Sequence, residues 1–262
     1  MTTQPMNQEV KLSMSGAVAI VEICRPPHNF FDTKLIAQLG ETFEALDRDP
    51  QCRAVVLAAE GKSFCAGANF SSPENQATLA KGTTEKHLYK QAIRLFRIRK
   101  PVVAAVQGPA VGGGLGLALV ADFRVSCAEA RFSANFCKLG FHPGFGLTTT
   151  LPRVVGAQMA ALLFYTARRI DGEEAKRIGL VDVLVPQSEV RSAALALATE
   201  IAESAPLAVM STRETMRRGL VDAIDASTER ELVEQTWQRA TEDFTEGVKA
   251  MSERRLPQFK GR

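Results

Sequence analysis

The sequence predicts an α/β fold with a parallel-rich sheet, followed by a helical C-terminal region. Short apolar runs of strand length alternate with amphipathic helical segments in the first part of the chain, which is typical of parallel strands covered by helices. From Gly156 onward the pattern is almost wholly helical. The 262 residues are 45% hydrophobic, which is enough to bury a substantial core.

Each element of the first part follows from a local pattern. Two β-type runs, at 9–14 and 17–24, are joined at Ser15-Gly16, whose composition suits a hairpin turn. Residues 32–47 carry apolar side chains at helical spacing. Further strands are expected at 54–58, 102–106, 123–126 and 131–133, with helices that begin at Glu85 and after the glycines at 112–114.

The helical part begins and ends its helices at recognisable signals. Asp171 and Asp243 each precede a glutamate by three residues, which is capping-box spacing. Ser188, Pro206 and the polar stretch at 225–228 are each expected to open or interrupt another helix.

Composition narrows the class of protein. The formal net charge of +3 comes from 32 basic and 29 acidic residues without a basic tail, which argues against a nucleic-acid partner. The five cysteines show no metal-ligand spacing and suit reduced thiols, so no metal is expected. Residues 1–9 lack the order of a signal peptide, and no apolar stretch is long enough to cross a bilayer. We therefore expect a cytoplasmic protein without a membrane partner.

The segment 64–70, FCAGANF, follows a strand and carries small residues that let a ligand approach the main chain. The amide of Ala68 is then able to point at a carbonyl oxygen. An ordinary turn between a strand and a helix has a similar composition, so this segment alone leaves both interpretations open.

A second segment, 100–122, is a strand and a turn followed by a helix that opens at the glycines 112–114. An amide from Gly113, paired with that of Ala68, forms a two-donor oxyanion hole in this interpretation. The alternatives are a phosphate loop or a close helix–sheet contact. No GxxxxGK(S/T) or GxGxxG frame fits, which disfavours a nucleotide phosphate.

The two segments and their spacing resemble the two oxyanion-hole motifs of the crotonase (enoyl-CoA hydratase/isomerase) superfamily. The resemblance runs nearly end to end, through Arg25-Pro26-Pro27 with Asn29, 130–146 (ARFSANFCKLGFHPGFG), 151–156 (LPRVVG), 174–186 (EAKRIGLVDVLVP) and the tail 241–262.

The resemblance implies a spiral of ββα units at 1–200 and a helical trimerisation and CoA-contacting region at 201–262. It implies a homotrimer or a hexamer built as a dimer of trimers, and an acyl-CoA substrate, with coenzyme A entering only as part of that substrate and no other cofactor. It carries the oxyanion donors onto Ala68 and Gly113. The implied substrate-binding positions are Arg25, His28, Ala66, Gly67, Phe70, Gly112, Gly116, Phe136, Leu139, Phe259 and Lys260, of which the last two reach the nucleotide end.

The sequence departs from the family at two positions. Hydratases of this family use two glutamates, because one carboxyl group gives a proton while the other takes one. The resemblance places Gly116 and Phe136 at those positions, and neither side chain carries a proton. We therefore expect hydration to be absent or slow, and decarboxylation, hydrolysis or isomerisation of an acyl-CoA to take its place. A catalytically silent acyl-CoA-binding protein is the alternative.

Three other side chains are candidates for acid/base work. His142 lies on a loop where crotonase relatives place a functional acidic group, and an imidazole titrates near neutrality. The alternative is a histidine that only packs the loop. His87 and Tyr89 belong to the helix that roofs the acyl pocket in relatives, and each is a further candidate.

Overall fold

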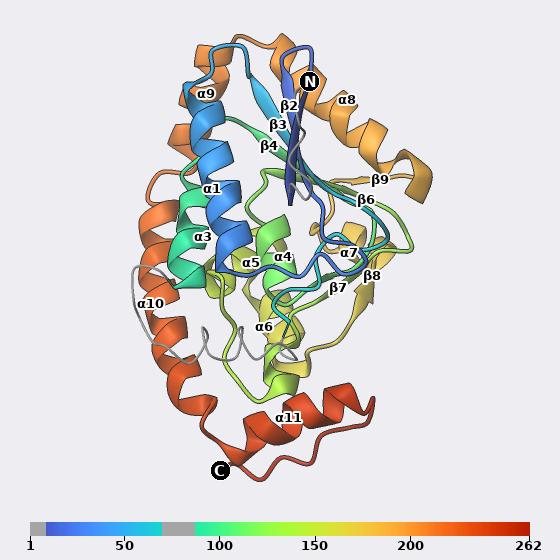
Figure 1. Ribbon diagram of the computed structural model, residues 1–262, viewed down its shortest axis with the longest axis vertical. Helices are drawn as coiled ribbons and strands as arrows, with labels where there is room; N and C mark the ends of the chain where they lie inside the picture. The colour runs from blue at the N-terminus through green and yellow to red at the C-terminus, as the bar shows by residue number, and fades with distance from the viewer. Residues whose placement is uncertain (1–8, 70–86) are drawn as a thin grey trace, which may run out of the picture.

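The computed structural model describes residues 9–69 and 87–262, which form an α/β architecture (Figure 1). Its main sheet has six strands in the order β1-β2-β3-β4-β6-β9. β1 pairs antiparallel with β2, and every later neighbour is parallel. The predicted α/β class with a parallel-rich sheet is therefore confirmed. The strands are β1 (Val10–Ser15), β2 (Val18–Ile23), β3 (Ala54–Ala59), β4 (Val102–Val106), β6 (Phe123–Ser126) and β9 (Val183–Leu184).

A second, three-stranded sheet has the order β5-β7-β8. β5 (Ala110–Val111) runs parallel to β7 (Arg131–Ser133), which pairs antiparallel with β8 (Ile170–Asp171). β5 directly precedes the glycines at 112–114. This small sheet therefore fixes the direction in which the chain enters the glycine run.

The helices cover the main sheet and extend beyond it. Figure 1 shows α1 and α3 on one side of the strands and α8 on the other. α8 packs on β3, β4 and β6. The helices are α1 (Thr33–Arg48), α3 (Leu88–Phe96), α4 (Gly113–Ala118), α5 (Leu147–Val155), α6 (Ala157–Thr166), α7 (Gly172–Arg177), α8 (Val190–Glu203), α9 (Pro206–Met216), α10 (Leu220–Gln238) and α11 (Glu242–Ser252). Two short 3-10 helices lie at Asn135–Leu139 and Gln187–Glu189.

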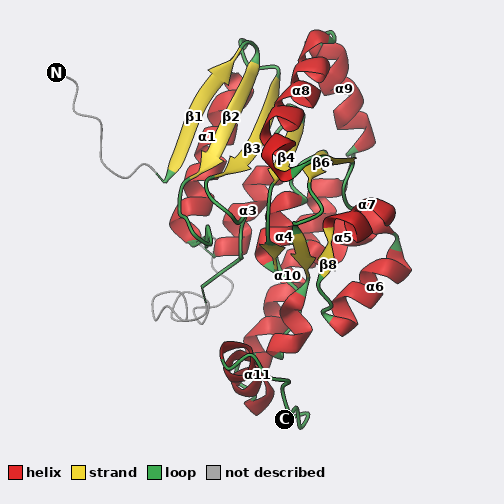
Figure 2. Ribbon diagram, turned by 90° about the vertical axis from the view of Figure 1, so that its right-hand side faces the viewer, coloured by secondary structure: helices red, strands yellow, loops and turns green. Residues whose placement is uncertain are grey.

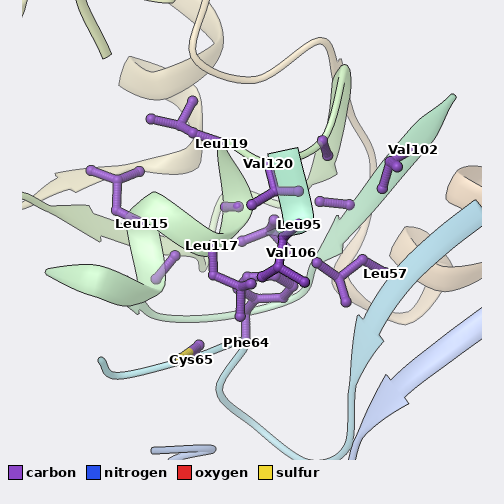
Figure 3. Close-up of a cluster of buried hydrophobic side chains, with 14 of the residues drawn as sticks. Leu57, Phe64, Cys65, Leu95, Val102, Val106, Leu115, Leu117, Leu119 and Val120 are labelled. Atoms are coloured by element: carbon purple, nitrogen blue, oxygen red, sulfur yellow. The ribbon is translucent and has the colours of Figure 1, made fainter. Parts of the chain in front are cut away.

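The core lies between the main sheet and α4. Figure 3 shows Phe64, which directly precedes Cys65, among Leu57, Val106 and Leu117. The Phe64 side chain is fully buried. Burial of a Phe or Leu side chain stabilises a fold by about 1.5–3 kcal/mol. The segment at 64–69 is therefore anchored by its first residue in the core.

The structure corrects four of the sequence expectations. β5, β8 and β9 are two-residue strands too short to carry a period-2 pattern, and β8 and β9 interrupt the region that was expected to be helical. α8 begins at Val190 rather than at Ser188, which lies in the preceding 3-10 helix. α10 runs without a break through 225–228. α11 is capped by Thr241, whose hydroxyl accepts from the Phe244 amide, and not by Asp243.

The C-terminal helices reach away from the sheet, as Figure 2 shows for α10 and α11. Asp243 binds the tail instead of capping α11, because its carboxylate accepts from the amides of Lys260 and Gly261. The predicted division at residue 200 stays a prediction, and residue 200 itself lies within α8. Among the described residues no single helix is long and apolar enough to cross a membrane. Two consecutive helical segments, Gln187–Glu203 and Pro206–Met216, together have the length and composition of a membrane span, but they are bent by 106° relative to each other.

Candidate active site

The segment at 64–69 is held against the loop that follows β2. The Ala66 amide donates to the His28 carbonyl at 3.0 Å, and the Phe31 amide donates to the Gly67 carbonyl at 3.0 Å. Phe31 and Ala68 form a parallel bridge, and Gly67 has a φ of 81°, which favours glycine. The backbone at Ala68 is therefore fixed by a neighbour far away in the sequence.

The start of α4 lies directly against this segment. The Val111 amide donates to the Cys65 carbonyl at 3.0 Å, and Cys65 forms a parallel bridge with Ala110. A Cβ atom added at Gly114 would overlap the carbonyl oxygen of Cys65 and lie 2.7 Å from its carbonyl carbon. Only glycine at this position allows the two main chains to approach so closely.

The Ala68 and Gly113 amides belong to two segments that lie in contact. A Cβ atom added at Gly67 would lie 3.4 Å from the Gly113 nitrogen. Within residues 9–69 and 87–262, neither amide is recorded as a donor to a protein acceptor. Two main-chain N–H groups without a partner, held by rigid neighbours, can both donate to one oxyanion. The structure thus brings together the two segments that the sequence singled out.

Phenylalanine side chains surround the start of α4. A Cβ atom added at Gly113 would overlap the Phe31 ring, and one added at Gly116 would lie 2.7 Å from Cδ1 of Phe145. The centroids of the Phe31 and Phe145 rings are 5.4 Å apart. Phe136 is buried, and its ring edge lies 3.8 Å from a Cβ atom added at Gly112. Gly116 and Phe136 are therefore both in apolar surroundings.

α10 holds the loop that carries Phe145. The Glu231 carboxylate accepts from the Gly146 amide at 2.8 Å and from both the amide and the hydroxyl of Thr148. The Gln235 side chain donates to the His142 carbonyl at 2.8 Å. Burial raises the pKa of Glu231 to about 7, although these hydrogen bonds oppose the shift. Glu231 thus takes the place of an N-cap side chain for α5.

His142 lines a cavity to which neither Ala68 nor Gly113 contributes. Its Nδ1 atom is 2.8 Å from the Pro143 carbonyl, and its amide donates to Gln238 of α10 at 2.6 Å. A bond to a carbonyl requires a proton on Nδ1, which leaves Nε2 as an acceptor in the neutral ring. The cavity of about 740 Å³ that His142 lines also borders Phe141, α6, α10 and the tail, but neither Ala68 nor Gly113. The structure therefore does not bring His142 to the two amides.

His87 and Tyr89 are buried beside α10. The Nδ1 atom of His87 accepts from the Tyr89 amide at 3.1 Å and caps α3. Burial, with the nearby positive charge of Arg239, lowers the pKa of His87 to about 4, so its ring is neutral at pH 7. The Tyr89 ring packs edge-on against Phe145, at 6.1 Å, and burial raises the pKa of its hydroxyl.

The predicted CoA-contacting residues are spread over two regions. Arg25 forms ion pairs of 2.8 Å with Glu9 and Asp32, and the His28 side chain is exposed beside it. The Lys260 amide donates to Asp243 of α11 at 2.7 Å, and α11 lies with the C-terminus at the end of the molecule away from the hairpin (Figure 2). No contact between the two groups is recorded in the described chain.

The remaining predicted positions have simple surroundings. Leu139 is buried against Gly247 of α11, and Ala66 is half-buried. Phe70 lies outside the described residues, as does Glu85. Over the part of the chain that the structure describes, no three His, Cys, Asp or Glu side chains gather to hold a metal ion.

Sequence reasoning missed Phe31, Phe145 and Glu231. Phe145 lies between two glycines, and a phenylalanine in a GFG run looks like an ordinary loop residue. Glu231 lies in a helix rich in charged residues, so nothing marks it as buried. The only local signal was the two consecutive phenylalanines after Asn29, which are unusual in a loop that opens a helix.

Comparison with known proteins identifies the family. The family model described as enoyl-CoA hydratase/isomerase matches residues 13–262. The chain is 35% identical over 261 residues to the short-chain-enoyl-CoA hydratase of Clostridium acetobutylicum, covering 97% of this chain and 98% of the relative. The crystal structure of carnitinyl-CoA hydratase from Mycobacterium avium superposes with a TM-score of 0.87 at 31% identity, covering 98% of this chain and all of that chain. The (E)-benzylidenesuccinyl-CoA hydratase of Thauera aromatica is 34% identical over 256 residues, covering 96% of this chain and 99% of the relative. The chain therefore belongs to the enoyl-CoA hydratase/isomerase family, the crotonase superfamily.

Proposed function

We propose that the protein binds an acyl-CoA thioester and stabilises its enolate with the amides of Ala68 and Gly113. The observation that supports this proposal is the close contact of the two segments that carry these amides, neither of which donates to a protein acceptor within the described residues. Such preorganised donors stabilise charge as it develops on a thioester oxygen. The names of the relatives support the substrate class, since each refers to a CoA thioester.

The reaction we favour is one that needs no pair of carboxylates. In decarboxylation of a malonyl-type thioester, the bond between the α-carbon and the carboxylate breaks and its electron pair forms the enolate. CO2 leaves, and a solvent proton then adds to the α-carbon. Only the oxyanion hole is indispensable for this sequence, which suits a site with Gly116 and Phe136 where hydratases carry glutamates. Hydrolysis of a thioester or C–C bond, and isomerisation with His142 as base, are the neighbouring options.

A catalytically silent acyl-CoA-binding protein is the second candidate. It is favoured by Gly116 and Phe136, because neither side chain carries a proton and the nearest atoms to a Cβ at Gly116 belong to the Phe145 side chain. The shared fold also leads us to expect a trimer or a hexamer in the cytoplasm.

A substrate panel separates these functions. The purified protein is incubated with methylmalonyl-CoA, crotonyl-CoA and 3-enoyl-CoA, while calorimetry measures the binding of CoA. We expect release of CO2 from methylmalonyl-CoA and little hydration of crotonyl-CoA. Tight binding without turnover of any substrate supports the silent protein instead. Rapid hydration of crotonyl-CoA contradicts the assignment of Gly116 and Phe136.

The Ala68→Pro variant tests the oxyanion hole, because proline removes the amide hydrogen and leaves the side chain small. Loss of one oxyanion donor lowers kcat by about 10² to 10³. We expect this loss in the reaction that the panel identifies, with CoA affinity and the thermal midpoint nearly unchanged. The Ala68→Gly variant, which keeps the amide, is the matched control. Equal rates for both variants show that the Ala68 amide takes no part.

The His142→Ala variant tests the imidazole. We expect the rate of decarboxylation to be unchanged, because His142 lines a cavity that borders neither amide. Loss of a general base lowers a rate by about 10² to 10⁴. A loss of that size, with the thermal midpoint unchanged, assigns His142 as the base of an isomerisation or hydrolysis.

A further inference from the structure

We propose that Phe145 is a specificity-determining residue, whose ring occupies the volume that a side chain at position 116 needs and closes the enolate site to water. This inference rests on the proposed function for its chemical meaning. Its steric part concerns only Gly116 and Phe145 and is tested independently of any activity.

The contact between Gly116 and Phe145 leaves no room for a side chain on α4. A Cβ atom added at Gly116 would lie 2.7 Å from Cδ1 of Phe145 and 2.9 Å from its Cβ and Cγ atoms. Real Cβ atoms do not approach other atoms so closely. The Phe145 ring is buried on all sides, so it cannot turn into solvent to make room. A glycine inside a helix destabilises it by about 1 kcal/mol relative to alanine. The close contact with Phe145 therefore explains why glycine occupies position 116 in spite of this cost.

The backbone at Phe145 is held in an unfavourable conformation. Its φ is 66°, where a bulky side chain is rare and strained. Strain of this kind persists only where the surroundings impose it, and it is concentrated at functional sites. Here the Glu231 carboxylate binds the Gly146 amide, and a Cβ atom added at Gly144 would lie 2.5 Å from Tyr89 and Gln235. Neighbours on both sides thus fix the ring of Phe145 over Gly116.

The ring also closes the site next to the Gly113 amide. Phe145 packs on Phe31 at 5.4 Å, and Phe31 touches Gly113. Water that attacks a double bond needs a polar group to hold it, and the wall formed by Phe31 and Phe145 offers none. A substrate carboxylate placed against such a wall loses its hydration, which favours loss of CO2. The wall therefore favours decarboxylation of 2-carboxyacyl thioesters over reactions in which water attacks the substrate.

A stability cycle tests the steric part. The thermal midpoint is measured for Gly116→Ala, Phe145→Ala and the double variant. We expect Gly116→Ala to lower the midpoint by about 2–12 °C in the native background, since overpacking a core costs about 1–3 kcal/mol and 1 kcal/mol corresponds to about 2–4 °C. In the Phe145→Ala background the same change raises the midpoint, because alanine favours the helix.

Phe96→Ala is the matched control for Phe145→Ala. The Phe96 and Phe145 rings pack edge-on with centroids 6.4 Å apart, and Phe96 is not among the nearest neighbours of a Cβ atom at Gly116. Phe96→Ala therefore makes a cavity nearby and leaves the Phe145 ring at position 116. Gly116→Ala should remain destabilising in that background. If Gly116→Ala shifts the midpoint equally in the native and Phe145→Ala backgrounds, the proposal is wrong. Loss of folding in the double variant, with Phe145→Ala folded, counts equally against it.

A gain of hydration tests the exclusion of water. Gly116→Glu with Phe136→Glu is compared with the triple variant that adds Phe145→Ala, using crotonyl-CoA. We expect the triple variant to hydrate at least about tenfold faster than the double variant, as a positioned acid/base group contributes about 10² to 10⁴ in rate. Equal rates, or a triple variant that unfolds while the double variant folds, overturn the role of Phe145. Hydration by the unmodified protein contradicts both the assignment of Gly116 and Phe136 and the exclusion of water by Phe145. The steric part of the proposal is then decided by the stability cycle alone.

Discussion

Gly114→Ala is expected to prevent stable folding or to lower the free energy of unfolding by more than about 3 kcal/mol, at the upper end of overpacking penalties. The reason is that the added methyl group would overlap the main-chain carbonyl of Cys65, not a side chain that can turn away. Either the start of α4 or the segment at 64–69 must move. We therefore expect any variant that still folds to lose CoA-thioester binding as well, which urea denaturation and calorimetry measure together.

Gly40→Ala is the matched control for this experiment. Gly40 lies within α1, and the nearest atoms to an added Cβ belong to the flexible Arg94 side chain at 3.3 Å. A small gain or loss of stability is expected there, since alanine favours the helix by about 1 kcal/mol. Equal stabilities of Gly114→Ala and Gly40→Ala would show that the contact between Gly114 and Cys65 is looser than we describe.

Glu231→Ala is expected to lower the free energy of unfolding by about 3–5 kcal/mol, because it leaves several buried donors without their acceptor. The donors are the amides of Gly146 and Thr148 and the Thr148 hydroxyl. Loss of these bonds frees the loop before α5. We also expect the start of α5 to exchange amide hydrogens faster, which mass spectrometry measures.

The same residue gives the stability a specific dependence on pH. Burial raises the pKa of Glu231 to about 7 in the folded state, so between pH 4.5 and 7 the folded chain binds more protons here than the unfolded chain. The contribution of Glu231 to stability is therefore largest below pH 4.5 and falls by up to about 3 kcal/mol as the pH rises to 7.

Glu231→Gln measures this dependence, because glutamine keeps the shape and does not titrate. Urea denaturation gives the free energy of unfolding of both proteins at pH 5 and pH 8. The difference between the two proteins at each pH cancels the contributions of the groups that they share. The free energy of unfolding of the native protein should exceed that of the variant by more at pH 5 than at pH 8. A difference that is the same at both pH values shows that the pKa of Glu231 is unshifted, and a larger difference at pH 8 shows that its pKa is lowered.

Much of the fold was predictable because its signals are local. The Asp32 and Asp171 side chains cap the helices that follow them, and both bonds span three residues. The turn of the first hairpin differs from its prediction by one residue, with Gly16 at a φ of 58°. Predictions failed where a distant partner decides the outcome. Asp225 was expected to interrupt a helix, but it forms an ion pair of 2.8 Å with Lys90 and stays within α10.

The candidate site shows the same division between local and distant signals. Small residues at 66–68 and 112–114 marked both oxyanion segments, because close approach of main chains requires them. Arg25 was expected to contact CoA, and its ion pairs with Glu9 and Asp32 could not be read from spacing. The contact between Gly116 and the Phe145 side chain cannot be predicted from either segment alone, since it exists only in the packing between them.

The double role of Phe31 ties the site to the folding of the whole chain. Its main chain bridges Ala68, and its ring touches Gly113, so three distant segments meet at one residue. Such non-local contacts require the native topology of the chain. A thioester that occupies the two amides should then bind the folded state alone and raise the thermal midpoint with its concentration. A thermal-shift screen of CoA thioesters therefore offers a way to find the natural acyl group before any turnover is known.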